Sequence, residues 1–371
     1  MKNIHTRILL ITMYIVISCG FVFGQFVWEK YWNNPLEIHG TPGSWNERAI
    51  VPYVIFNPDS NRFEMWYTAF SGYPNAGIGF KYSYDGIGWA TNYPDPVMIP
   101  SATGWDSLFV GAPCIIKESN VYKMWYTGWK SNTGFPHSIG YAESTDGGIT
   151  WDKHPTPVLS PDIGWESGAV GYPSVIKVAN GYRMFYTGEV SLGIARTGRA
   201  YSNDGINWQR DTENNPVLPA GDVGEWDRNN YLARVMEMND SLYLWYTAES
   251  NPGVSGTAIG FATSADTGKT WTKYSGNPVL TRGITGSWDA GWIETGSVLF
   301  YENDLLLYYD GGGPATGNMG RVGLATSIIV SVKVILRLND INSSSVSNVI
   351  VIFTGSNSRF SLIVKSIYFI P

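Results

Sequence analysis

The sequence predicts an all-β fold built from one unit of about sixty residues that occurs five times. A Trp opens each unit, at successive spacings of 60, 60, 61 and 62 residues: Trp45, Trp105, Trp165, Trp226 and Trp288. Aromatic residues make up 15% of the chain, charged residues only 15%, and there are 42 Gly, as suits strands joined by tight turns. No long stretch has apolar residues at helical spacing, which argues against a helical domain.

Each unit contains the same succession of predicted strands. An apolar strand follows the Trp, as at 113–116, and an aromatic-rich strand comes next, such as FEMWYTA at 63–69 and YKMWYTG at 122–128. A third strand, such as IGFKYS at 78–83, leads through a tight turn to a short fourth one. We expect the aromatic-rich strands to be buried between neighbouring sheets. Four strands repeated five times are typical of a five-bladed β-propeller with four-stranded blades.

The tight turns carry an acidic residue that we interpret as structural. They read SYDGIGW at 83–89, STDGGITW at 144–151, SNDGINW at 202–208 and SADTGKTW at 264–271, and they resemble Asp-box turns. The Asp carboxylate can accept hydrogen bonds from the N–H groups of its own turn, while Gly supplies a backbone conformation that other residues resist. We therefore assign the turn aspartates no catalytic role: Asp85, Asp146, Asp204 and Asp266.

The N-terminal segment supplies the piece that the fifth unit lacks. That unit stops at Ser327 without a fourth strand, whereas WEKYWNNPLEI at 28–38 matches WTKYSGNPVL at 271–280. We expect the N-terminal strand to complete the last blade and close the ring, which removes an open sheet edge. The predicted propeller covers 26–327, and 328–371 is a C-terminal tail of unknown structure.

The first residues read as an export signal. A basic start with Lys2 and Arg7 precedes an uncharged apolar run at 8–18 that is short for a membrane-spanning helix. Either 1–24 is a signal peptide, or a lipoprotein signal ends before Cys19. The protein is then periplasmic, extracellular or lipid-anchored, without a transmembrane span. Cys114 would be the one remaining cysteine, so no intramolecular disulfide is expected.

The net charge of the chain limits the classes of molecule that it is expected to bind. The formal net charge is -6, with no basic patch in the sequence, which argues against nucleic-acid binding. The sequence contains no metal-binding motif, so we predict no cofactor. Calcium in the funnel is an alternative that no sequence motif supports. We expect a monomer whose partner is a carbohydrate.

One face of the predicted propeller gathers the residues that could carry chemistry. The first strand of each blade starts at the face where the second strand ends, opposite the turn aspartates, so both sets of residues converge on one funnel. Carboxylates able to transfer protons, with aromatic faces that stack on sugar rings, indicate a carbohydrate site. The candidate catalytic residues are Glu294, Asp310 and Glu249, and the candidate substrate-binding residues are Arg234, Arg48, Glu189, Trp129, Phe70 and Trp292.

Two of these residues break the repeat at the axis. Arg234 stands where other units have Pro or Gly, and Glu294 stands at an apolar strand start, where Arg234 is its expected partner. Alternatively, Glu189 and Glu249 are solvated loop acids, and Asp310, followed by three glycines, shapes a turn. The acids directly after the repeat Trp recur in register, and we interpret them as structural: Asp106, Glu166, Asp227 and Asp289.

These units resemble the five-bladed superfamily of arabinanases, levansucrases and invertases, notably glycoside hydrolase families 43 and 32. The resemblance rests on IGYAESTDGGITW at 139–151 and YKMWYTG, and it covers about 26–327. It implies three carboxylates at inner-strand starts: a base or nucleophile, a tuning Asp and a Glu general acid. Ile293-Glu294-Thr295-Gly296 resembles the general-acid motif. Val51 and Ala112, however, stand in columns where the family carries acids.

Three functional hypotheses follow. The first is an exported glycosidase in which Glu294 is the general acid and Asp310 or Glu249 is the second carboxylate, with Glu47 and Asp106 as other possible sources of acids. In it, Arg234 and Arg48 bind substrate oxygens or an acidic sugar. The second is a non-catalytic glycan-binding or scaffold propeller, which explains the missing acids. The third is a sialidase-like hydrolase, although no set of three arginines is evident.

Overall fold

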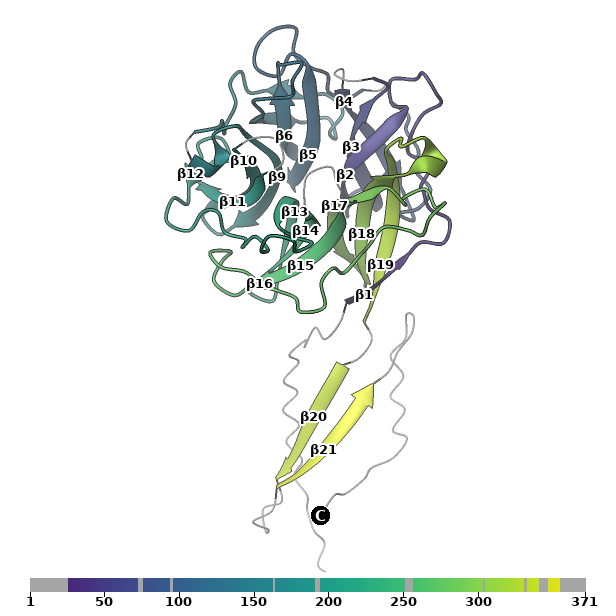
Figure 1. The fold of residues 1–371 in the computed structure, drawn as a ribbon, viewed down its shortest axis with the longest axis vertical. Helices are drawn as coiled ribbons and strands as arrows, with labels where there is room; N and C mark the ends of the chain where they lie inside the picture. The colour runs from purple at the N-terminus through teal and green to yellow at the C-terminus, as the bar shows by residue number, and fades with distance from the viewer. Residues whose placement is uncertain are drawn as a thin grey trace, which may run out of the picture. The chain divides into compact units, whose positions relative to one another are not determined.

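The computed structural model describes residues 26–329 apart from 73–75, 94–95, 163, 191–193, 251–255 and 303, together with 332–339 and 346–353. The predicted signal at 1–24 lies outside these residues. The described part is all-β apart from two single-turn 3-10 helices, η1 (Gly164–Glu166) and η2 (Pro314–Thr316) (Figure 1). It contains no helix long and apolar enough to span a membrane.

Residues 28–327 form one compact unit whose strands lie in four sheets. From β2 to β19, neighbouring strands of a sheet pair antiparallel, except for one parallel pairing, Ala76 with Phe109, that joins β4 (Ala76–Ser83) to β5 (Phe109–Glu118). A separate antiparallel pair is formed by β20 (Val332–Asn339) and β21 (Val346–Phe353).

The sheets follow the order of the sequence units. The largest sheet contains β2 (Arg48–Asn57), β3 (Arg62–Phe70), β4 (Ala76–Ser83), β5 (Phe109–Glu118), β6 (Val121–Trp129), β7 (Ser138–Ser144) and β8 (Asp152–Lys153). The second contains β9 (Ala169–Val178), β10 (Gly181–Glu189), β11 (Ala195–Ser202) and β12 (Gln209–Arg210). The third contains β13 (Asn229–Met238), β14 (Ser241–Glu249), β15 (Ala258–Ser264) and β16 (Thr272–Lys273). The fourth contains β17 (Trp292–Tyr301), β18 (Asp304–Gly312), β19 (Arg321–Ile329) and β1 (Phe26–Lys30).

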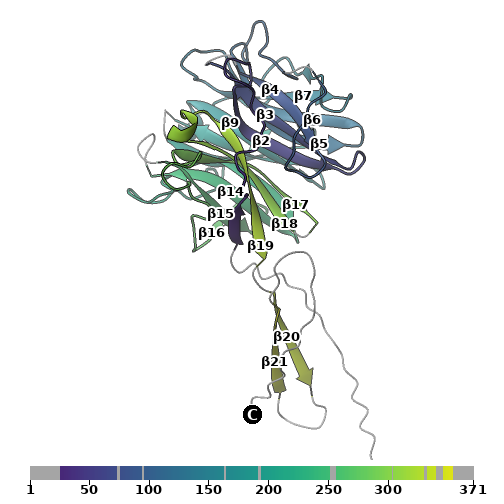
Figure 2. The ribbon, with the colours of Figure 1, turned by 90° about the vertical axis from the view of Figure 1, so that its right-hand side faces the viewer.

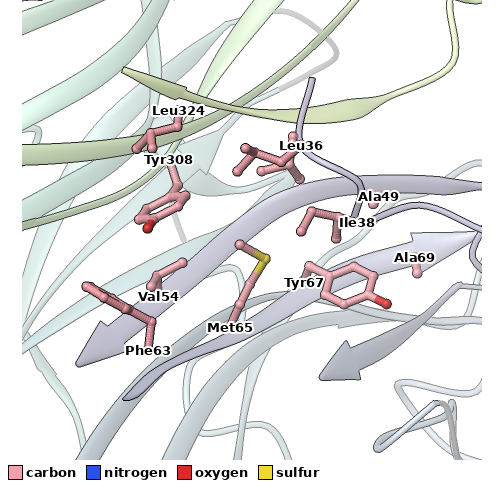
Figure 3. Packing of buried hydrophobic residues seen from close by; sticks show 11 residues of the cluster. Leu36, Ile38, Ala49, Val54, Phe63, Met65, Tyr67, Ala69, Tyr308 and Leu324 are labelled. Atoms are coloured by element: carbon pink, nitrogen blue, oxygen red, sulfur yellow. The ribbon is translucent and has the colours of Figure 1, made fainter. Parts of the chain in front are cut away.

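The aromatic-rich strands form the core, because side chains on both of their faces are buried. In β3, every residue from Phe63 to Ala69 is buried. Such a strand gains burial on both faces, which explains why its sequence is mainly apolar and aromatic, with Glu64 and Thr68 as the buried polar exceptions. Figure 3 shows one cluster, where Leu36 of the N-terminal segment packs with Met65 of β3 and Tyr308 of β18. The two ends of the compact unit therefore share one core.

The N-terminal strand β1 lies beside β19 in the fourth sheet (Figure 1; Figure 2). Lys30 Nζ lies 2.5 Å from Asp289 Oδ2, as Lys273 does from Asp227 in the third sheet. Asn34 accepts the N–H of Leu324 at 2.9 Å and donates to its carbonyl at 2.8 Å. Asn277 makes the same two bonds to Phe261. Side chains of the N-terminal segment thus hold the last sheet as internal segments hold theirs.

Asn34→Ala is expected to lower the free energy of unfolding by roughly 1–3 kcal/mol, because the N–H of Leu324 loses its partner and the Leu324 carbonyl keeps only its bond from the N–H of Tyr31. Urea denaturation measures the change. The control is Asn33→Ala, since Asn33 is exposed next to it. Equal stability of the two variants would contradict a role for this segment in holding the last sheet.

The turn aspartates are occupied by their own turns, as their structural interpretation requires. Asp85 Oδ1 accepts the N–H groups of Ile87 and Gly88, each at 2.8 Å. Although partial burial opposes it, hydrogen bonds from Thr150 and Ser144 lower the pKa of Asp146 to about 2. A carboxylate with so low a pKa is a poor proton donor at neutral pH.

Candidate functional site

The site is built on the first strands of the sequence units. Strand β2 contacts β5, β5 contacts β9, β9 contacts β13, β13 contacts β17, and β17 contacts β2. Each strand carries a bulge at the same place, which re-aims the side chains that follow. At the bulge, Val51, Ala112 and Leu232 form a small buried apolar cluster. The polar residues just before and after the bulge are therefore close in sequence to this buried apolar cluster.

A column of threonines next to the bulges links neighbouring strands, and Asp310 takes the fifth place in it. Thr68 Oγ1 accepts the N–H of Ala112 at 2.7 Å, and Thr127, Thr187 and Thr247 make equivalent bonds. In the fourth sheet, Asp310 Oδ1 accepts the N–H of Val51 at 3.0 Å. Asp310 is fully buried, and its Oδ2 has no hydrogen-bond partner among the described residues.

The register corrects the sequence alignment of Asp310. The sequence grouped Asp310 with Phe70, Trp129, Glu189 and Glu249 at the ends of the second strands. In the structure, those four residues are the last residues of β3, β6, β10 and β14. Asp310 instead lies two residues before the end of β18. A single acid in a column of hydroxyls is therefore the exception that sequence spacing missed. It also shows that Asp310 does not shape the following turn, since it lies within a strand.

Glu294 is the cross-strand partner of Asp310. Its side chain is half-buried, and the Tyr231 hydroxyl donates to its Oε1 at 3.2 Å. Burial and the nearby charge of Glu249, opposed by the bond from Tyr231, raise the pKa of Glu294 to about 7. Burial and the charge of Glu294 also raise the pKa of Asp310 well above its ordinary range. A carboxyl that is protonated near neutral pH is suited to donate a proton.

Glu249 completes a carboxylate cluster that we define as Glu294, Asp310 and Glu249. Glu249 is half-buried at the end of β14, and Asn229 Nδ2 donates to its Oε1 at 3.2 Å. Its charge acts on both Glu294 and Tyr231. The three candidate catalytic residues therefore gather from two neighbouring sheets. Tyr231 and Asn229 were missed because the sequence alignment gave them no distinct column.

Arg234 does not have the predicted role. It is 3% exposed, its Nη1 donates to the carbonyl of Pro173 at 2.8 Å, and its Nε donates to the carbonyl of Gly296. The guanidinium lies over the Tyr53 ring, 5.6 Å from its centroid. The hydroxyl of Tyr231, rather than Arg234, is hydrogen-bonded to Glu294. Arg234 therefore links the first strands β9, β13 and β17, and its charge acts on the buried Asp310 of the cluster.

The register also moves Arg234 to another column. It pairs with Trp245 directly after the bulge, as Tyr53 pairs with Trp66 and Cys114 with Trp125. Its column is thus not the Pro or Gly column that the sequence predicted. Cys114 is buried and free, and its Sγ accepts the N–H of Val175 at 3.2 Å.

The aromatic rings that were predicted to contact a sugar differ in how far they are covered by neighbouring side chains. Trp129 is buried, and its ring stacks on Phe109 on one side and on His137 on the other, with centroids 3.4 Å and 4.5 Å away. Both faces are covered in this conformation, so stacking of Trp129 on a sugar would require Phe109 or His137 to move. Phe70 is half-buried at the end of β3 under the guanidinium of Arg48, at 5.4 Å.

The two remaining candidate substrate-binding residues, Trp292 and Glu189, each lie at an end of a strand. Trp292 begins β17 and is half-buried opposite Gly312. Glu189 ends β10, and burial alone raises the pKa of Glu189 to about 7. No hydrogen bond of the described residues joins either side chain to the carboxylate cluster.

The acids after the repeat Trp are structural. Tyr126 donates to Asp106 at 3.0 Å, and Lys153 lies 2.9 Å from the same oxygen. The same arrangement of a Tyr and a basic residue recurs at Glu166, Asp227 and Asp289. Glu47, the other alternative, accepts the N–H of Gly43 at 3.1 Å in its own loop. The described residues include no group of three or more His, Cys, Asp or Glu side chains arranged to hold a metal ion.

Comparisons with known proteins find a similar fold in solved structures of other proteins. No protein-family model matches the chain. A solved glycoside hydrolase has a TM-score of 0.63 at 18% identity, over 76% of this chain and 87% of that one. A thermostable family-43 glycoside hydrolase has a TM-score of 0.56 at 18% identity, over 84% and 95%. The β-1,2-mannobiose phosphorylase of Listeria innocua has a TM-score of 0.62 at 12% identity, over 81% and 97%. At these identities the likeness establishes the fold.

Curated sequences are similar over part of the chain. An uncharacterized protein of Mycobacterium tuberculosis (strain CDC 1551 / Oshkosh) is 30% identical over 157 residues, which are 40% of this chain and 48% of that protein. The β-1,2-mannobiose phosphorylase of Thermoanaerobacter sp. (strain X514) is 34% identical over 95 residues, which are 23% and 31%. The chain spans about half the length of the first curated relatives it matches.

Proposed function

We propose that the chain is an exported carbohydrate-active enzyme built as a five-bladed β-propeller, with four-stranded blades and a ring closed by the N-terminal strand. The five sequence units and the mutual contacts of the five first strands support this architecture. The place of β1 beside β19 supports the closure, as does the bond from Val51 N–H to Asp310. The turn aspartates then lie in Asp-box turns. Export rests on the signal-like start of the sequence alone.

The proposed reaction is cleavage of a glycosidic bond. The observation that carries it is Glu294, a half-buried acid whose pKa is raised to about 7 beside two further carboxylates. Glycoside cleavage needs one carboxyl that is protonated, to protonate the leaving oxygen, and a second that is ionised. Two carboxyl groups whose surroundings differ can supply both forms at one pH.

The burial of the three carboxyls assigns their roles. Glu294 is the general acid, because it is protonated near neutral pH and half-buried. Glu249 is half-buried as well and is the second carboxylate, which activates the acceptor or stabilises the positively charged transition state. Asp310 has no exposed surface, so it cannot contact substrate directly. It acts through Glu294 as a positioning residue.

A second candidate reaction is phosphorolysis, in which phosphate rather than water accepts the sugar. Both the sequence and the fold are similar to β-1,2-mannobiose phosphorylases. The same general acid serves either acceptor, since the leaving oxygen needs a proton in both cases.

The test is to incubate the full chain with furanosides, fructans, mannosides and β-1,2-mannobiose, with and without inorganic phosphate. Release of reducing sugar without phosphate supports hydrolysis, whereas phosphate-dependent formation of a sugar phosphate supports phosphorolysis. A glycan that binds but is not cleaved under either condition would favour the non-catalytic alternative and contradict the proposal.

A further inference from the structure

Two arginines lie next to the carboxylate cluster, outside the set described above. Arg196 is in β11 opposite Gly188, and Arg228 directly precedes Asn229, the first residue of β13. Arg196 Nη1 lies 2.7 Å from the Ala195 carbonyl and 3.5 Å from Asn229 Oδ1. The other end of the same Asn229 amide donates to Glu249 at 3.2 Å. One side chain therefore separates Arg196 from the cluster.

The charge of Arg196 is uncompensated in the described structure. Its register column holds small residues in three other units, Gly77, Ser138 and Ala258. Burial and the charge of Arg228 lower the pKa of Arg196, and its hydrogen bonds among the described residues go to the Ala195 carbonyl and the Asn229 amide oxygen rather than to a carboxylate. The fifth residue of the column, Arg321, differs because burial lowers its pKa but the carboxylates of Glu47 and Glu37 partly oppose that effect.

We propose that Arg196, with Arg228, binds an oxyanion of the substrate or acceptor beside the carboxylate cluster. An anion would supply the negative charge that Arg196 lacks among the described residues, and the planar fork of Arg suits carboxylate and phosphate oxygens. The oxyanion belongs either to an acidic sugar or to free phosphate. This inference rests on the proposed function, and it moves the recognition of an acidic group from Arg234 to the edge of the cluster.

The experiment is calorimetric titration of the full chain, at constant ionic strength, with sodium phosphate, sodium glucuronate and glucose. We expect the wild type to bind at least one of the two anions and to bind glucose more weakly. Binding of phosphate alone identifies free phosphate as the source, and binding of glucuronate alone identifies an acidic sugar. Arg196→Gln and, as a second variant, Arg228→Gln are each expected to weaken that binding at least about tenfold.

The matched control is Arg282→Gln, because Arg282 is an exposed arginine elsewhere whose Nη1 contacts backbone carbonyls. It should bind the anion as the wild type does. No binding of either anion to the wild type, or equal binding by Arg196→Gln, Arg228→Gln and the control, would overturn the proposal. The measurement needs no turnover, so a failure of the proposed cleavage leaves its result interpretable. Glu294→Gln should retain anion binding even where cleavage is lost.

Discussion

Glu294→Gln is expected to lower kcat/KM for glycan cleavage by about 10²- to 10⁴-fold, the usual contribution of a positioned general acid. The amide keeps the shape of the side chain and can still accept the bond from Tyr231, which lies 3.2 Å from Oε1. It cannot donate a proton to the leaving oxygen. Substrate binding should change little, so the loss should fall on kcat rather than on KM.

The pH dependence of the wild type provides an independent readout. Glu294 must be protonated to act, and its pKa is raised to about 7, so kcat/KM should fall as the pH rises through about 7. The Tyr231 hydrogen bond lowers that pKa, since it favours the ionised form. Tyr231→Phe should therefore shift the alkaline limb of the profile to higher pH.

The control for Glu294→Gln is Glu213→Gln, because Glu213 is an exposed glutamate with no described role in the cluster. It should retain wild-type rates and the wild-type pH profile. Cleavage that is unchanged in Glu294→Gln would remove Glu294 from the mechanism and leave the acid unassigned.

Asp310→Thr is expected to stabilise the protein at alkaline pH. Threonine occupies this column in the other four units and would accept the N–H of Val51, as Thr68 accepts that of Ala112. Burial and Glu294 raise the pKa of Asp310, so the folded state holds a proton that the unfolded chain releases at lower pH. Stability from this proton is fully present below the unfolded pKa near 4 and is lost as the pH rises toward the folded pKa.

Urea denaturation at pH 5 and pH 9 tests this expectation. The wild type should lose stability between the two values, and Asp310→Thr should lose roughly 1–3 kcal/mol less, the scale of a buried group left without a partner. Asp222→Thr is the control, since Asp222 is exposed. The same pH dependence in all three proteins would show that Asp310 is not a strained acid. If Asp310 positions Glu294, the variant should also cleave glycans more slowly while remaining folded.

The sequence was sufficient to predict the strands and the pairing of the chain ends. The aromatic strands can be predicted because burial on both faces favours a mainly apolar and aromatic sequence, as in β3 and β6. The place of the N-terminal segment in the last sheet can be predicted because its Lys30 and Asn34 repeat a sequence pattern that occurs in internal units. Glu294 and Glu249 also stood out, as acids at strand ends.

The sequence by itself thus determined an all-β chain of five similar units, with its acids gathered at one end of the strands. Only the tertiary structure decided which acids face one another and how each is buried. The reason is hydrogen-bond register, which includes the same one-residue β-bulge in each first strand and aligns equivalent residues of different units. Grouping residues by the ends of the sequence segments instead placed Asp310 with strand-end residues and Arg234 with Pro and Gly. Register places Asp310 among the threonines, opposite Glu294, and Arg234 directly after the bulge of β13.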